Sequence, residues 1–284
     1  MPGEDGPVRE GAGAGAPAPV PRALTIAGSD SGGGAGIQAD LKTFAVLGVW
    51  GMSAITAVTV QNTVGVSDVA ELPPHIVGDQ VRAIATDIGV DAAKTGMLSS
   101  AAIVEAVADA VEDTGIGNLV VDPVFVSKHG DPLLRADAVE ALRRRILPLA
   151  VLVTPNLPEA GRLAGFEVAT REDMLRAAEA ILAQGARAVL VKGGHLGGDT
   201  SDDLFAEPGR TDWLVTPRID SPHTHGTGCT LSAAIAAYLA RGQDLPEAVR
   251  GGKEFVTEAI RHGLAIGRGI GPVSPGWRLL GGEA

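Results

Sequence analysis

Short apolar runs alternate with longer amphipathic stretches along most of the chain. The short runs are rich in valine, isoleucine, leucine and alanine and end at glycine, asparagine, Asp-Pro or Thr-Pro, which is typical of strands buried on both faces of a sheet. The longer stretches space their apolar residues with helical periodicity. We expect strands at about 23–27, 53–60, 92–95, 118–121, 150–153 and 188–191. We expect helices at about 38–47, 74–87, 101–113, 137–146, 170–184, 228–240 and 245–260.

The order of these elements predicts the fold class. Repeated strand–helix units produce a parallel sheet with helices on both faces. We therefore expect one α/β domain with a three-layer α/β/α fold and a mostly parallel central sheet, spanning residues 22–284. The segment 195–220 differs, because its turn residues and short β-like runs predict one or two hairpins at the sheet edge. Residues 1–21 are rich in glycine, alanine and proline and predict a disordered tail.

Each predicted strand runs directly into a glycine-rich or polar loop. These loops are 28–36, 61–62, 96–97, 122–124, 154–159 and 192–194. Ligands of open parallel sheets bind at the carboxyl ends of the strands. Any one loop could be an ordinary surface connection, but six of them at one sheet edge indicate the rim of an active site.

Composition narrows the function classes. Asp and Glu outnumber Lys and Arg, 34 to 23, and aromatic residues make up 3% of the chain, so neither a basic nucleic-acid surface nor a base-stacking platform is expected. A single cysteine excludes an internal disulfide framework and a cysteine-rich metal cluster. No apolar run approaches the roughly 18 residues of a membrane-spanning helix, and no signal peptide is evident. We expect a cytoplasmic protein with neither a nucleic-acid nor a membrane partner.

The first loop, 28–36, holds five glycines in nine positions. Glycine lets the backbone approach a ligand closely. The loop lacks the Gly-Lys-Ser/Thr ending of a Walker A motif, and it does not match the dinucleotide fingerprint. It is not a nucleophile elbow either, because Asp30 occupies the central position. The loop is either a ligand-binding segment or a flexible connector.

The second motif, 225–230, reads His-Gly-Thr-Gly-Cys-Thr and leads into an apolar helix. The first N–H groups of a helix and its dipole form an anion site. Cys229 lies in the first turn, where the dipole lowers a thiol pKa and favours the thiolate. The alternative is a cysteine that acts only as a small buried hydrophobe.

A third set combines Asp122, Thr154, Asn156, Glu159 and Lys192 near the ends of three strands. Asn156 and Glu159 have the spacing of a capping box, which is one interpretation. The alternative is that the carboxylates organise a Mg²⁺ ion that retains several waters, as in phosphate chemistry. Lys192 is either a phosphate counter-ion or a solvated charge.

Two further interpretations arise from the histidines. His223 and His225 could ligate a zinc ion, but no third ligand is evident in the sequence. His225 and Cys229 would suit a thiol hydrolase, although the tight turn between them disfavours productive pairing.

Seven motifs in this order make the chain resemble the ribokinase-like superfamily and, more narrowly, the bacterial hydroxymethylpyrimidine/phosphomethylpyrimidine kinases of thiamine biosynthesis. They span most of the chain outside the tail. The motifs are AGSDSGGGAGIQADLKTF (27–44), QNT (61–63), KTGML (94–98), GDPLL (130–134), TPNLPEA (154–160), VKGGH (191–195) and HGTGCTLSAAIA (225–236).

The resemblance implies ATP-dependent phosphorylation of 4-amino-5-hydroxymethyl-2-methylpyrimidine, and then of its monophosphate to the diphosphate, with Mg²⁺ and in a homodimer. It implies four groups of site residues. Catalytic residues are Gly226, Thr227, Gly228 and Cys229; substrate-binding residues are Gly28, Ala35, Thr59, Gln61, Met97 and Val124; nucleotide-binding residues are Asn156 and Lys192; metal-organising residues are Asp122, Thr154 and Glu159.

The resemblance leaves two alternatives open. Cys229 stands where many sugar kinases of the superfamily place a catalytic aspartate, and relatives with this cysteine can use pyridoxal, so a pyridoxal/pyridoxine kinase is the first alternative. The second is a non-catalytic pyrimidine-binding protein. Gln61 suits an aminopyrimidine, because an amide donates and accepts hydrogen bonds at once and can pair with an amino group and a ring nitrogen.

Overall fold

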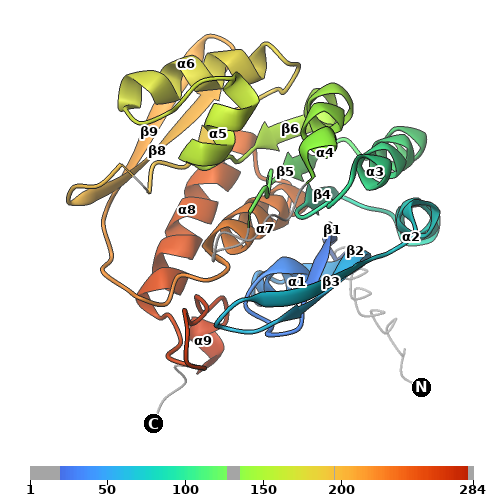
Figure 1. Ribbon diagram of the computed structural model, residues 1–284, viewed down its shortest axis with the longest axis horizontal. Helices are drawn as coiled ribbons and strands as arrows, with labels where there is room; N and C mark the ends of the chain where they lie inside the picture. Colours follow the sequence, from blue (N-terminus) through green and yellow to red (C-terminus); the bar gives the residue numbers. More distant parts are fainter. Residues whose placement is uncertain (1–19, 127–134, 195, 281–284) are drawn as a thin grey trace, which may run out of the picture.

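A sheet of nine strands, in the order β3-β2-β1-β4-β5-β6-β7-β8-β9, forms the centre of the computed structural model, which describes residues 20–126, 135–194 and 196–280 (Figure 1). β1 to β7 are parallel except β3, which is antiparallel to β2 at one edge. At the other edge β8 and β9 form an antiparallel hairpin. The strands are β1 (Arg22–Asp30), β2 (Trp50–Gln61), β3 (Val66–Glu71), β4 (Ala92–Thr95), β5 (Leu119–Val121), β6 (Ala150–Val153), β7 (Val189–Val191), β8 (Thr200–Glu207) and β9 (Arg210–Pro217).

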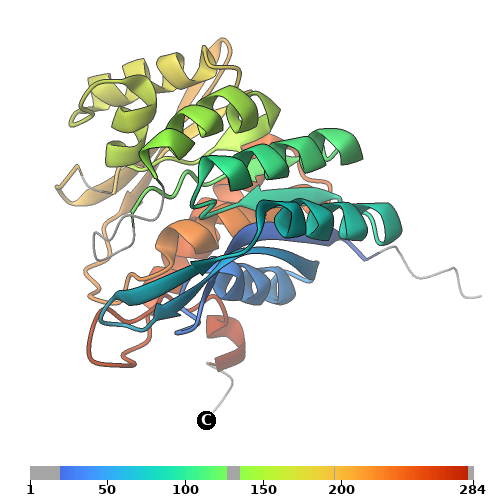
Figure 2. The same cartoon turned by 45° about the vertical axis from the view of Figure 1, so that its right-hand side comes forward.

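Helices cover both faces of this sheet, as Figure 2 shows. One hydrophobic cluster joins the sheet to α2 through α6, and the other joins it to α1, α7 and α8. The helices are α1 (Gly36–Val46), α2 (Pro74–Asp87), α3 (Ala101–Thr114), α4 (Ala136–Ala141), α5 (Leu157–Ala164), α6 (Arg171–Leu182), α7 (Thr227–Ala240), α8 (Leu245–Arg261) and the short α9 (Trp277–Leu280). The predicted three-layer α/β/α fold with a mostly parallel sheet is therefore confirmed.

Helix α7 lies deepest of the helices. Its residues from Thr230 to Ala237 are all buried, because it packs against the sheet on one side and against α1 and α8 on the others. This explains why its sequence is apolar all round rather than amphipathic. The deep position carries the amino end of α7 to the carboxyl edge of the central strands.

Some sequence predictions fall outside the described residues. Residues 1–19 of the predicted tail, the motif GDPLL and His195 belong to this group. Within the described part of the chain, no helix is long and apolar enough to span a lipid bilayer.

Candidate active site

A cavity of about 610 Å³ follows the carboxyl edge of the sheet. It runs across the strand order, from Gln61 at the end of β2 to Ser201 and Thr216 on the β8–β9 hairpin. Each of the six loops predicted at this edge contributes to the wall. A cavity of this size lies within the range of small-molecule and cofactor sites.

Fourteen of the fifteen predicted site residues line this cavity. The exception is Thr154, which is fully buried behind Asp122. Its hydroxyl donates to Asp122 Oδ1 at 3.2 Å. Thr154 therefore contributes to the site indirectly, by orienting that carboxylate.

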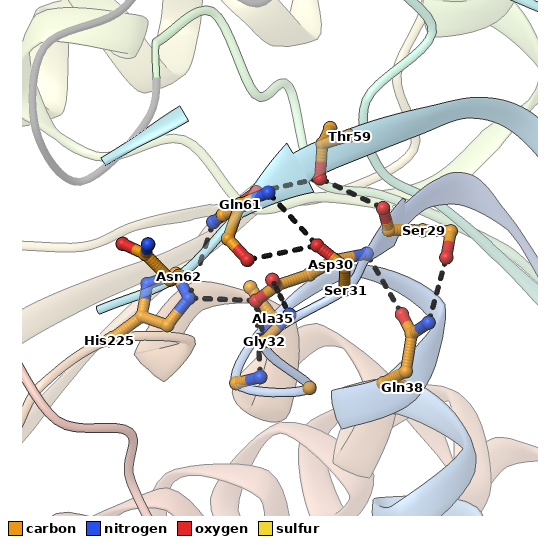
Figure 3. Close-up of polar contacts among 12 residues, drawn as sticks. Ser29, Asp30, Ser31, Gly32, Ala35, Gln38, Thr59, Gln61, Asn62 and His225 are labelled. Carbon is orange, nitrogen blue, oxygen red and sulfur yellow. Dashed lines mark hydrogen bonds and ion pairs between the residues drawn. The ribbon is translucent and has the colours of Figure 1, made fainter. Parts of the chain in front are cut away.

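The glycine-rich loop 28–36 is held by the carboxylate of Asp30 (Figure 3). This carboxylate accepts the backbone N–H groups of Gly32, Gly34 and Ala35 at 2.8, 3.1 and 2.9 Å. Burial opposes the charge, but the hydrogen bond and charge of His225 and the backbone N–H groups hold the pKa of Asp30 below its ordinary value. Of the two interpretations of this loop, the flexible connector does not fit such a braced conformation.

His225 links this loop to the cradle that begins α7. Its Nε2 lies 2.9 Å from Asp30 Oδ2 and 3.4 Å from Gln61 Nε2 (Figure 3). The imidazole therefore interacts with Asp30 and Gln61. These contacts argue against the interpretation of His225 and Cys229 as the pair of a thiol hydrolase. Within the described residues no group of three or more His, Cys, Asp and Glu side chains could hold a metal ion, so the zinc interpretation finds no support either.

The two glycine-rich loops touch at backbone distance. Gly226 caps α7 with a φ of 79°, a left-handed conformation that favours glycine. A Cβ atom at Gly226 would lie 1.9 Å from the carbonyl oxygen of Gly34. Only glycine fits there, and its lack of a side chain leaves the N–H groups at the start of α7 open to the cavity.

Cys229 lies in the first turn of α7 and lines the cavity. The backbone N–H of Gly36, the first residue of α1, acts on its sulfur to lower the pKa of the thiol. Burial nevertheless raises the pKa of the thiol from 9.0 to about 11, and the neighbouring charge of Lys94 opposes this rise. The thiolate expected from the helix dipole alone is therefore not the main form at neutral pH, because burial outweighs the dipole.

This thiol pKa predicts the chemical reactivity of Cys229. The rate of alkylation by iodoacetamide should be at least about 10-fold below that of free cysteine at pH 8, since only the thiolate reacts. The rate should still be rising at pH 10, as expected for a group with a pKa of about 11. The chain has a single cysteine, so mass spectrometry of the intact protein reports this thiol alone. A plateau near pH 7 would contradict the prediction.

Asp122, Glu159 and Lys192 form a charged cluster in the middle of the cavity. Lys192 Nζ lies 2.9 Å from Asp122 Oδ1 and 3.9 Å from Glu159 Oε2. Burial opposes the charge of Lys192, but the two carboxylates raise its pKa above the ordinary value. Lys192 is therefore a paired cation with a side chain only 15% exposed, rather than a solvated one.

The capping box predicted at the start of α5 is present. Asn156 Oδ1 accepts the N–H of Glu159 at 2.9 Å, and Glu159 Oε2 accepts the N–H of Asn156 at 2.7 Å. Glu159 also faces Lys192, so the same carboxylate caps the helix and belongs to the cluster. Burial raises the pKa of Glu159 to about 7, although Lys192 opposes this rise.

Two buried ion pairs in the cavity wall were not predicted. Lys94 pairs with Asp40 on α1 at 2.9 Å, and Lys253 on α8 pairs with Asp203 on β8 at 2.7 Å. A lysine inside a predicted buried strand was the available signal for Lys94, because a sealed ammonium needs a partner. Lys253 and Asp203 are fifty residues apart, and no local pattern connects them.

The comparisons with known proteins agree with this geometry. Residues 30–274 match the family described as phosphomethylpyrimidine kinase. The chain belongs to the phosphomethylpyrimidine kinase family. It is 56% identical to the hydroxymethylpyrimidine/phosphomethylpyrimidine kinase of Streptomyces coelicolor, over 90% of this chain and 94% of that protein. It is 50% identical to the Haemophilus influenzae enzyme of the same name, over 88% and 95%.

Members and neighbours of the family with solved structures share the fold. The ADP complex of Bacillus subtilis pyridoxal kinase has a TM-score of 0.86 and 40% identity, covering 92% of this chain and all of that one. The phosphomethylpyrimidine kinase of Clostridium difficile has a TM-score of 0.75 and 44% identity, covering 84% and 99%. The ribokinase-like fold and the kinase activity expected from the sequence are thus confirmed.

Proposed function

We propose that this enzyme transfers the terminal phosphoryl group of ATP to the hydroxymethyl group of 4-amino-5-hydroxymethyl-2-methylpyrimidine, and then converts the monophosphate to the diphosphate. The observation that carries the proposal is that one cavity holds Gln61, the Cys229 thiol and the open amino end of α7. Its close relatives bear the names of kinases of this pyrimidine and its phosphate.

Gln61 binds the aminopyrimidine edge in this proposal. The Thr59 hydroxyl lies 3.0 Å from Gln61 Oε1, and the backbone N–H of Gln61 donates to Ser31 Oγ at 2.9 Å. The amide is thereby fixed in orientation and keeps capacity to donate to a ring nitrogen and to accept from an amino group. Met97 and Val124 supply apolar wall for the ring.

Phosphoryl transfer depends on positioning and on stabilising charge rather than on covalent chemistry. The N–H groups of residues 227–229 at the start of α7 cradle the transferred group, with Lys192 as the cation beside it. The thiolate form of Cys229, a minor species at neutral pH, accepts the proton of the hydroxymethyl group and becomes the neutral thiol; its position beside the cradle suits this role. The ADP and AMP-PCP complexes of related kinases support the binding of an adenine nucleotide.

The residues present fit a Mg²⁺ ion. Asp122 and Glu159 place two carboxylates in the cavity wall, and Mg²⁺ in kinases takes one or two carboxylates, with waters and phosphate oxygens completing its shell. Asp122, oriented by Thr154, and Glu159 would hold it. When bound, the ion would neutralise phosphate charge. A homodimer and a cytoplasmic location stay predictions.

Turnover assays test the proposed function. ADP release should depend on the hydroxymethylpyrimidine and on its monophosphate, with phosphorylated products identified by mass spectrometry. Pyridoxal is the third arm of the assay, because several solved relatives are pyridoxal kinases. Activity with pyridoxal alone would favour the alternative, and binding of the pyrimidine without ATP turnover would indicate a non-catalytic binding protein.

Replacing Gln61 by leucine should weaken pyrimidine binding. Leucine leaves the amino group and ring nitrogen of the substrate without partners, which costs about 1–3 kcal/mol. We expect KM for the pyrimidine to rise about 10- to 100-fold while KM for ATP stays nearly constant. Asn62→Leu is the matched control, since Asn62 follows Gln61 but does not line the cavity. Equal pyrimidine affinity in wild type and Gln61→Leu would refute the contact.

A further inference from the structure

The side-chain amide of Gln61 lies between two polar side chains of the cavity wall. The Thr59 hydroxyl lies 3.0 Å from its Oε1, and Nε2 of His225 lies 3.4 Å from its Nε2 (Figure 3). The oxygen and nitrogen of an amide have nearly the same shape, so the hydrogen bonds of the neighbours decide which of the two positions each atom occupies. The protons on Thr59 and His225 therefore determine how Gln61 presents its donor and its acceptor.

His225 presents an N–H group to this amide. Its Nε2 lies 2.9 Å from Oδ2 of Asp30, and the Asp30 carboxylate accepts three backbone N–H groups of its own loop. Such a carboxylate is ionised, because hydrogen bonds to the charged form favour it. An ionised carboxylate at this distance requires a proton on the imidazole nitrogen, since two acceptors would repel each other. An N–H of His225 therefore faces the nearer atom of the Gln61 amide, which favours the oxygen in that position.

The Thr59 hydroxyl favours the same orientation. Its oxygen lies 2.9 Å from the backbone carbonyl oxygen of Ser29 and 3.0 Å from the amide of Gln61. A hydroxyl has one proton, so it cannot donate to two oxygens, and the Ser29 carbonyl can only accept. With its proton on Ser29, the hydroxyl accepts from Gln61, which favours the amide nitrogen on the side of Thr59.

We propose that His225, held by Asp30, is a positioning residue that directs the oxygen of Gln61 toward itself and the nitrogen toward Thr59, and thereby makes the enzyme select the amino form of the pyrimidine. The inference rests on the proposed function for the contact between Gln61 and the substrate. One N–H and one lone pair of the amide remain for that contact, and their order is fixed.

A fixed order of donor and acceptor discriminates between two related pyrimidine edges. An amino group beside a ring nitrogen offers a donor and then an acceptor. A carbonyl beside a ring N–H, as in the 4-oxo analogue, offers the reverse. The reversed edge places donor against donor and acceptor against acceptor, and a site with preset hydrogen-bonding groups rejects such a mismatch strongly.

Packing keeps the imidazole in this place. His225 is 5% exposed, and a Cβ atom at Gly34 would lie 2.4 Å from its Cδ2. The ring therefore lies directly on the glycine-rich loop that Asp30 braces. His225, Thr59 and Gln61 all line the cavity, so the orientation of the amide acts where the substrate is proposed to bind.

The proton on Nε2 of His225 is measured without substrate. Long-range proton–nitrogen NMR spectra distinguish a protonated imidazole nitrogen from a bare one, and the signals of His225 are those absent from the His225→Gln variant. We expect Nε2 to carry a proton at neutral pH in the free enzyme. A bare Nε2 would overturn the proposal. This readout requires neither binding nor turnover, which separates it from the proposed function.

Calorimetric titration without ATP tests the selectivity, with 4-amino-5-hydroxymethyl-2-methylpyrimidine and its 4-oxo analogue as probes. The wild type should bind the amino compound about 100-fold more tightly than the analogue. In His225→Phe, which keeps a ring but has no N–H, this preference should fall to about 10-fold. His225→Gln supplies an N–H again and should restore the preference. An equal preference in wild type and His225→Phe would overturn the inference.

Two further variants separate orientation of the amide from folding. His75→Phe is the matched control, because His75 is exposed on α2 and does not line the cavity, and we expect it to keep the preference of wild type. Thr59→Val removes the other orienting group and should also narrow the preference, so it tests the same orientation if His225→Phe does not fold. An unchanged preference in folded Thr59→Val would contradict the proposal.

The outcomes also distinguish this inference from the proposed function. Turnover of the amino compound by a wild type that binds the 4-oxo analogue equally well would overturn the inference and leave the proposed function standing. Binding of neither probe by the wild type would contradict the proposed contact of Gln61 and, with it, the selectivity.

Discussion

Replacing Cys229 by alanine should lower kcat by about 10²- to 10⁴-fold, the usual contribution of a positioned proton acceptor. KM for the pyrimidine and for ATP should change little, since the wall around the substrate and the N–H groups of α7 remain. The sulfur lines the same cavity as Gln61, as this role requires. Steady-state kinetics with separate titrations of ATP and pyrimidine would measure the effect.

Thr230→Ala is the matched control for this variant. Thr230 is the next residue of α7 and is buried, and it does not line the cavity. We expect it to lower stability but to leave kcat within a few-fold of wild type. An unchanged kcat in Cys229→Ala would remove the thiol from catalysis and leave the cradle as the main source of rate acceleration.

The central strands are the part of the fold that local sequence pattern predicts best. β4 and β6 have the predicted bounds, Ala92–Thr95 and Ala150–Val153, because strands covered on both faces are continuously apolar and end abruptly at turns. β3 was not predicted. Most of its side chains are exposed at the sheet edge, so the sequence Val66–Glu71 has little apolar alternation to detect.

The candidate site likewise has one part that the sequence predicts and another that it does not. Loops at the ends of parallel strands meet because of topology, so their place at one edge followed from the order of elements alone. The contacts between loops did not follow. His225 pairs with Asp30 across 195 residues, and Lys94 pairs with Asp40 across 54. These pairings depend on which face of a strand or helix meets which neighbour, and that is set by packing rather than by local pattern.

The direction of the pKa shift of the Cys229 thiol could not be predicted from the local sequence. The helix dipole and the Gly36 N–H both favour the thiolate, and the motif alone indicated a lowered pKa. Burial of α7 between the sheet, α1 and α8 has the larger effect and raises the pKa to about 11. Burial is a tertiary property, so the sign of the shift became evident only with the fold.

Replacing Lys192 by methionine should have the second large effect. Lys192 separates Asp122 from Glu159, and without it two buried carboxylates face the phosphates of ATP. Lost attraction and added repulsion act together, so we expect kcat/KM for ATP to fall about 10²- to 10³-fold. KM for the pyrimidine should change much less, because its proposed contact, Gln61, lies at the end of β2 rather than in the cluster of Asp122, Glu159 and Lys192.

Lys42→Met is the control for total charge, since Lys42 on α1 is exposed and does not line the cavity. It removes one positive charge and should leave kcat/KM for ATP nearly unchanged. Calorimetric titration with ATP in the presence of EDTA isolates the contact of Lys192 with phosphate from any effect on Mg²⁺. Weaker ATP binding in EDTA is expected for Lys192→Met. A direct contact of Lys192 with phosphate would weaken the binding of ATP much more than that of the pyrimidine. An equal loss of affinity for both substrates would instead indicate that Lys192 shapes the whole cavity through Asp122.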